Sequence, residues 1–297
     1  MHERPPQGEA VPPIHQIRRL YVALGLVVVA LILLGALILI RHDSTPQNSG
    51  SSESFSAAPG SLVSSLAQIP SSVSNSVGVT SPTYPVTAPH SVKSGAAWTV
   101  TKADGVRPVV FFYGAEFDPY AAAQRWPLIV ALSRFGSFGQ LGLVQSSATE
   151  VFSNLSSFTF WDSSYSSRWI SLRTVERYGS VDPTGARYVG LQKPDATEAS
   201  AISAFDTSPT TFPLLDIGNR FIQIGASYTP SALAGLTQAA IANDLTYPTN
   251  PITQAVETSA NEITAAICSA TDEKPGAVCR ARGVVAADQK MGVDPTS

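Results

Sequence analysis

The chain has 297 residues, of which 44% are hydrophobic and only 14% are charged, and its formal net charge is −3. Soluble domains have about 25% charged residues, so this composition predicts that part of the chain lies in a membrane. Without a positive surface to hold a phosphate backbone, nucleic acid is excluded as an expected partner. The four histidines are His2, His15, His42 and His90. Because no histidine follows residue 90, a Ser-His-Asp hydrolase and a His-built zinc site are not expected in the rest of the chain.

The first predicted element is a transmembrane helix at Tyr21–Ile40. These uncharged residues would span about 30 Å, the thickness of a bilayer core. The run is longer than the apolar region of a cleaved signal peptide and ends at Arg41, so it predicts an uncleaved signal anchor. After Arg41 the next Lys or Arg is Lys93. The positive-inside rule therefore places residues 1–20 in the cytoplasm and the C-terminal part outside the plasma membrane.

Residues 41–96 are predicted to be a Ser-rich linker, because residues 44–80 contain thirteen serines. Within it, apolar residues recur at three- and four-residue steps and predict a short amphipathic helix interrupted at Pro70. This helix would pack on the folded domain or lie on the bilayer. The apolar positions are Leu62, Val63, Leu66, Ile69, Val73 and Val77. We expect the folded domain to begin near Ala97.

Residues 109–113 (VVFFY) form a continuous apolar run, the pattern of a strand covered on both faces. Asp118 followed by Pro119 predicts a helix start, since an Asp side chain can cap the first amide groups and Pro fits the first helical position. The helix would extend to Ser133, with a kink or interruption at Pro127. A second strand at 141–144 would then pair in parallel with the first.

The rest of the chain predicts an inserted β-rich segment, a hairpin and several helices. The hairpin signal is Gly218-Asn219 between two apolar runs. The expected elements are the insertion at 148–190, a helix at 195–205, strands at 214–217 and 221–224, helices at 229–243 and 251–270, and a polar, frayed tail at 282–297.

A buried strand, a turn, a helix opening with Pro-Tyr, and a later Phe-Pro before a hairpin together resemble a thioredoxin fold. Residues 109–147 and 211–221 also resemble domain-of-unknown-function family 929, a family of membrane-anchored thioredoxin-like proteins; we expect the likeness to cover most of 60–280. It implies an α/β, thioredoxin-like extracytoplasmic domain at 97–281. This domain would carry the inserted β-rich segment and an extra C-terminal helix.

The motif of that family is altered in this chain. Where its helix begins Cys-Pro-Tyr-Cys, this sequence has Asp118, Pro119, Tyr120 and Ala121. Thiol-disulfide exchange needs a low-pKa thiolate and a second thiol, and a carboxylate and a methyl group can replace neither. The likeness also implies that Pro213, after Phe212, is a cis proline beside the motif, where the backbone of relatives pairs with an extended peptide. The implied groove is Tyr120, Phe212 and Pro213.

Several side chains near the motif allow two interpretations. Asp118, with Glu116 close by, could form a catalytic or loose hard-cation site, but a helix cap is favoured. Tyr120 is expected at the surface and Trp126 in the core, although both could form a partner surface. Arg125 is expected to be solvated or ion-paired. We expect neither a bound metal nor a cofactor.

Cys268 and Cys279 are the two cysteines, and on the outer side of a membrane they predict a structural disulfide.

Because both motif cysteines are replaced, the favoured function is binding. The chain would be a protein-binding, scaffold or chaperone-like envelope component that contacts lipid through residues 21–40, and it is not expected to be an enzyme. Two alternatives remain. One is a thiol-disulfide oxidoreductase-related enzyme using Cys268 and Cys279 or a partner's thiols. The other is a structural subunit of a membrane assembly, in contact through residues 148–180.

Overall fold

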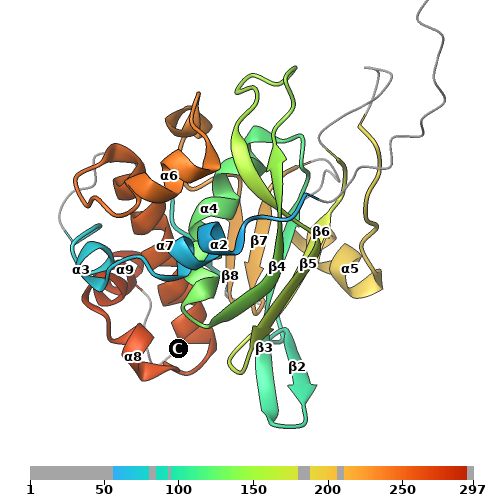
Figure 1. Ribbon diagram of the computed structural model, residues 1–297. Helices are drawn as coiled ribbons and strands as arrows, with labels where there is room; N and C mark the ends of the chain where they lie inside the picture. The colour runs from blue at the N-terminus through green and yellow to red at the C-terminus, as the bar shows by residue number, and fades with distance from the viewer. Residues whose placement is uncertain (1–55, 80–84, 93–94, 180–187, 206–210, 293–297) are drawn as a thin grey trace, which may run out of the picture. The chain divides into compact units, whose positions relative to one another are not determined.

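The computed structural model describes residues 56–79, 85–92, 95–179, 188–205 and 211–292 (Figure 1). All of them belong to a compact unit that runs from Glu53 to Ser297. The predicted transmembrane helix at 21–40 lies outside the described residues. Among the residues that are described, no helix combines the length and the apolar composition needed to cross a membrane.

The described part of the chain is a mixed α/β structure. In chain order its elements are α2 (Gly60–Ala67), α3 (Ser71–Ser74), β1 (His90–Ser91), β2 (Thr99–Lys102), β3 (Gly105–Gly114), α4 (Pro119–Ser133), β4 (Gly136–Gln145), β5 (Ser156–Ser167), β6 (Ser171–Glu176), α5 (Ala196–Phe205), β7 (Leu214–Ile217), β8 (Phe221–Ile224), the 3-10 helix η1 (Pro230–Leu233), α6 (Gln238–Asp244), α7 (Pro251–Ala270), α8 (Gly276–Cys279) and α9 (Arg282–Met291).

Strand β3 is the centre of the main sheet. It pairs in parallel with β6 and antiparallel with β7, while β8 and β1 continue the sheet beyond β7. The first residues of β3 pair with β2 in an exposed hairpin, which projects at the bottom of Figure 1. The predicted parallel pair between residues 109–113 and 141–144 is therefore wrong. The parallel partner of β3 is β6, because β4 pairs antiparallel with β5 in a separate sheet.

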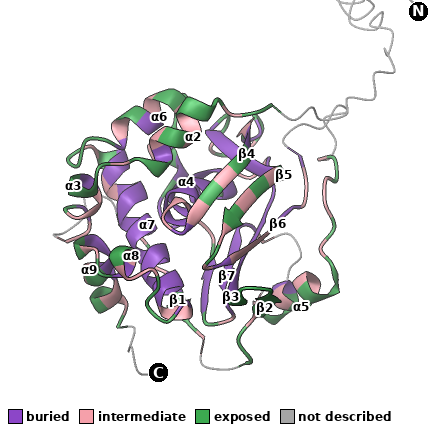
Figure 2. Ribbon diagram, turned by 60° about the horizontal axis from the view of Figure 1, so that its bottom comes forward, coloured by how far each residue is buried: buried purple, intermediate pink, exposed green. Residues whose placement is uncertain are grey.

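The alternating side chains of β3 pack on the two faces of the sheet. Val110 and Phe112 belong to a large apolar cluster with α4, α7 and the β4–β5 hairpin. Val109 and Phe111 belong to a second cluster with Ile202 of α5. The prediction of a strand covered on both faces is thus confirmed. Figure 2 shows α4 and α7 buried along most of their length.

Most predicted helices and the hairpin form where the sequence places them. Helix α4 ends at Ser133 as expected and is not interrupted at Pro127. The turn between β7 and β8 has positive φ at Gly218 and Asn219, 64° and 55°, the backbone that a tight hairpin requires. The helix expected at 229–243 is instead split into η1 and α6, because Gly235 lies between them with a left-handed φ of 74°.

The folded unit extends beyond both boundaries expected from the sequence. Helices α2 and α3 meet at Pro70, as predicted, and pack on the unit through Leu66 and Val73. The Asn261 side chain of α7 donates hydrogen bonds to the carbonyls of Ser74 and Val77, at 3.0 and 3.2 Å. Linker residues 60–79 are therefore part of the fold.

At the other end, the segment expected to be a frayed polar tail contains helix α9. Val284 and Ala287 are buried, and Lys290 forms an ion pair with Glu262 of α7. The prediction of a frayed tail is therefore wrong for residues 282–291. A narrow apolar stripe within a polar sequence is enough to pack this helix on the rest of the fold.

Candidate functional site

The motif lies at the first turn of α4, just beyond the end of β3. The Asp118 side chain accepts a hydrogen bond from the Ala121 amide at 2.6 Å, and Pro119 occupies the first helical position. This confirms the predicted helix cap. Burial raises the pKa of the Asp118 carboxyl to about 6, and the nearby Glu150 acts in the same direction. The Ala121 hydrogen bond and Arg125 oppose this rise in pKa.

Within the motif only Tyr120 is well exposed. Its side chain is 44% accessible, whereas Pro119 and Ala121 are buried. The Tyr120 ring meets Phe152 edge-on, with ring centroids 6.0 Å apart. Trp126, further along the same helix, is fully buried. The expected division, with Tyr120 at the surface and Trp126 in the core, is what the structure has.

Phe212 and Pro213 lie beside the motif, joined by a cis peptide bond. The Phe212 ring lies 5.1 Å from Tyr113 at the end of β3 and 6.0 Å from Phe117, the residue before Asp118. The Pro213 carbonyl accepts a hydrogen bond from Gly225. Among the described residues, neither the N–H nor the C=O of Phe212 forms a hydrogen bond. Phe212 as a whole is buried, with 8% of the residue exposed.

The loop after β4 and the short segment at residues 188–189 also lie beside the motif, although the motif itself does not predict them. The Ser147 amide donates to the Phe117 carbonyl at 2.9 Å, which ties the loop after β4 to the motif. Tyr188 stacks on Phe117 with centroids 3.7 Å apart and donates a 2.9 Å hydrogen bond to Glu150. We call this surface the α4 rim; its residues are Asp118, Tyr120, Glu150, Val151, Phe152, Tyr188 and Val189.

A buried ion pair connects α4 to the elements around the α4 rim. Arg125 Nε and Nη2 donate to the two Glu176 carboxylate oxygens at 2.9 and 2.6 Å, and both side chains are fully buried. Arg125 Nη2 also donates to the Ala115 carbonyl, and Glu176 accepts from the Phe160 amide. Arg125 is thus ion-paired rather than solvated. It joins α4 to β6 and to the turn that carries Asp118.

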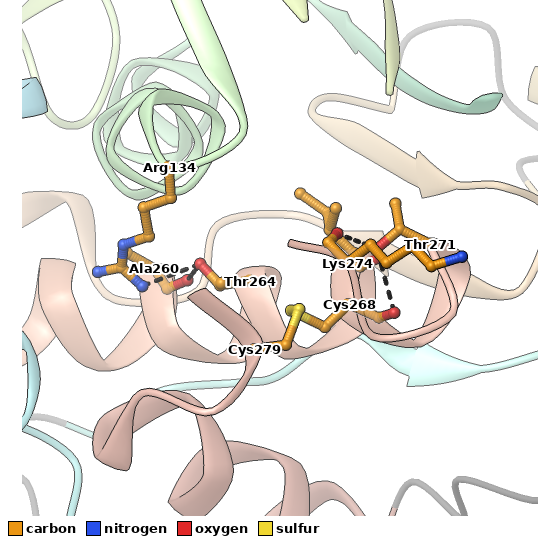
Figure 3. The surroundings of a disulfide bond; sticks show 8 residues. Arg134, Ala260, Thr264, Cys268, Thr271, Lys274 and Cys279 are labelled. Atoms are coloured by element: carbon orange, nitrogen blue, oxygen red, sulfur yellow. Dashed lines mark hydrogen bonds between the residues drawn. A yellow bond between two sulfur atoms is a disulfide. The ribbon is translucent and has the colours of Figure 1, made fainter. Parts of the chain in front are cut away.

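The disulfide between Cys268 and Cys279 forms as predicted and joins the end of α7 to α8 (Figure 3). Both cysteines are buried. Ala270, at the end of α7, lies near Gly218, which in turn approaches Pro108 in the first half of β3. The motif follows the other end of β3, about 20 Å away at 3.3 Å per residue. The disulfide and the α4 rim are therefore separate parts of the fold.

A polar cavity of about 350 Å³ opens at the disulfide end, between the β2–β3 hairpin and the loop after α7. Its charged lining includes both signs, Arg168 and Lys274 against Asp104 and Asp272. Asp104 is already bound by Arg107. In the described ranges, no group of three or more His, Cys, Asp or Glu side chains is placed to hold a metal ion.

The described structure places Phe212 beside Phe117 and Tyr120 beside Phe152, and it adds residues that the sequence did not reveal. Glu150 and Tyr188 are 38 positions apart, and no spacing rule joins them. The aromatic richness of residues 148–190 was the one available signal.

Comparison with known proteins gives one family match. The family described as Domain of unknown function (DUF929) matches residues 101–193, which include the motif, Glu150 and Tyr188 but not Phe212 or Pro213. This supports the family likeness over a shorter stretch than expected. No curated protein and no solved structure matches the chain.

Proposed function

We propose that the chain is a single-pass plasma-membrane protein whose extracytoplasmic, thioredoxin-like domain has lost redox chemistry and binds proteins or extended peptides as a scaffold or chaperone-like component. The sequence at Tyr21–Ile40 supports the anchor, and the Cys268–Cys279 disulfide fits an oxidising compartment.

The strand order supports the thioredoxin-like assignment. Strands run β6, β3, β7, β8, with β6 parallel and β7 antiparallel to β3. Helix α4 follows β3, and the Phe212-Pro213 dipeptide directly precedes β7. This is the order of strands in thioredoxin-like folds, with the β4–β5 hairpin inserted after the first helix.

The observation that carries the binding function is the α4 rim. Tyr120 and Val151 are 44% and 86% exposed around a helix start that has no cysteine. Grouped exposed apolar side chains mark interaction surfaces. Because Asp118 and Ala121 cannot form a mixed disulfide, binding is the activity that this position retains.

The alternative of a thiol-disulfide oxidoreductase-related enzyme is disfavoured by the cysteines. Cys268 and Cys279 are buried, bonded to each other and far from the motif. Insulin reduction by dithiothreitol, followed by turbidity, checks this point. The full chain is expected to leave the rate unchanged, and acceleration that depends on Cys268 would revive the enzyme.

Binding can be tested with the full chain purified in detergent. Fluorescence anisotropy of a pool of fluorescein-labelled random nonapeptides should report binding, and Tyr120→Ser should weaken it at least several-fold. Val106→Ser is the matched control, because Val106 is 64% exposed at the opposite end of β3. Equal effects of the two substitutions, or no binding at all, would contradict the proposal.

A further inference from the structure

The α4 rim gathers a large share of the exposed apolar side chains. Of the seven large hydrophobic residues exposed in the described part of the chain, three belong to it: Tyr120, Val151 and Val189. They are held on one surface, since Tyr120 contacts Phe152 and Tyr188 is bonded to Glu150. An apolar surface of this kind fits a partner rather than solvent.

The charge of the rim is negative. Asp118 and Glu150 are half-buried carboxylates that lie close enough for Glu150 to affect the Asp118 carboxyl electrostatically. Arg125 beneath them is committed to Glu176. Arg177, which follows β6, lies over the Tyr178 ring and donates to the Gln192 carbonyl. The rim thus presents two carboxylates among aromatic rings, the surroundings that favour a cationic side chain.

The backbone beside the rim can orient such a ligand. The antiparallel ladder between β3 and β7 ends at Tyr113 and Leu214, and Phe212 lies two residues before Leu214, beyond the end of the ladder. Its N–H and C=O form no hydrogen bond within the described residues. An extended segment can pair with backbone groups of this kind while its side chains reach adjacent surfaces.

From these three features we infer that the α4 rim selects an extended peptide by a Lys or Arg side chain, which lies between Glu150 and Asp118 and against the Tyr120 ring while the peptide backbone pairs with Phe212. This inference rests on the proposed binding function and names the chemistry of its ligand. Both charged side chains among the rim's described residues are acidic, so the cationic side chain of the peptide complements them, and the aromatic rings cover its aliphatic part.

The test compares four fluorescein-labelled nonapeptides that differ only at the central residue, which is Arg, Lys, Gln or Glu. Anisotropy titrations use the full chain in detergent at low ionic strength. We expect the Arg and Lys peptides to bind at least about tenfold more tightly than the Glu peptide, a difference of about 1.4 kcal/mol. Added salt should reduce this preference, because screening weakens exposed charge pairs.

Two variants locate the preference. Glu150→Gln should reduce the Arg-over-Glu ratio several-fold, and Glu150→Lys should reverse it. Asp118→Asn keeps an N-cap acceptor while removing the charge, so it separates selectivity from folding of the helix. Glu273→Gln is the control, because Glu273 is an exposed carboxylate in the disulfide loop at the far end of β3, and it should leave the ratio unchanged.

The outcomes separate this inference from the binding function. If all four peptides bind equally well and Tyr120→Ser still weakens binding several-fold, the rim binds peptides but the charge selectivity is refuted. A ratio that Glu150→Gln leaves intact, or that Glu273→Gln lowers equally, would refute it as well. If none of the peptides binds, both proposals fail.

Discussion

The buried pair between Arg125 and Glu176 gives the sharpest test of how the site is supported. Replacing Arg125 with Met removes two hydrogen bonds to Glu176 and one to the Ala115 carbonyl. Of the hydrogen bonds given above, the buried Glu176 carboxylate then keeps the one from the Phe160 amide. Breaking a buried pair on one side costs about 3–5 kcal/mol. The midpoint of urea unfolding, followed by tryptophan fluorescence, should therefore fall by roughly 1.5 M at a typical slope of unfolding free energy with urea concentration.

The double variant Arg125→Met with Glu176→Leu tests whether the loss of stability comes from the unpaired charge. It leaves no unpaired charge, so the remaining cost comes from the orphaned Ala115 carbonyl and Phe160 amide, about 1–3 kcal/mol each. We expect the double variant to lose clearly less stability than the two single losses added together, with a coupling energy of at least about 2 kcal/mol. Single losses that simply add would contradict a supporting role of the Arg125–Glu176 pair.

Three further predictions concern stability. Burial raises the pKa of Asp118 to about 6 in the folded state, so protonation favours the fold: this contribution is complete below about pH 4 and is lost as the pH rises past about 6, at a cost of at most about 3 kcal/mol. Asp118→Asn should therefore unfold at higher urea than wild type at pH 8 and at the same urea at pH 4; a deficit at pH 8 would contradict this. Replacing Cys268 and Cys279 with Ala should cost about 3 kcal/mol, and dithiothreitol should lower the urea midpoint of wild type but not of the variant. Val284→Ala in α9 should cost about 2 kcal/mol because Val284 is buried, whereas Val285→Ala, at an exposed neighbour, should cost under about 0.5 kcal/mol; equal small effects would mean that the C-terminal segment is frayed.

The local elements were predictable because their signals lie within a few residues. The run at 109–113 is apolar at every position, as a strand covered on both faces requires. Asp118-Pro119 carries both parts of a helix start, and Gly218-Asn219 provides the two left-handed residues of a tight turn. In each case backbone geometry and residue type impose the same conformation.

The errors come from contacts between distant segments. Nothing in residues 141–144 indicates that β4 folds back on β5 instead of pairing beside β3. Helix α9 was missed because its apolar stripe is narrow and makes sense only against α7. The α4 rim depends on a hydrogen bond between Tyr188 and Glu150, which a single sequence does not reveal.

The proposed binding surface at the start of α4 can be tested in intact membranes. A photocrosslinking amino acid is placed at Tyr120 and, in a separate variant, at Val106, and captured species are identified by mass spectrometry. We expect a discrete partner to be captured from Tyr120 but not from Val106, and its capture to be lost when Glu150→Lys is added. Capture from neither position in a folded chain, or equal capture from both, would contradict a binding role for this surface.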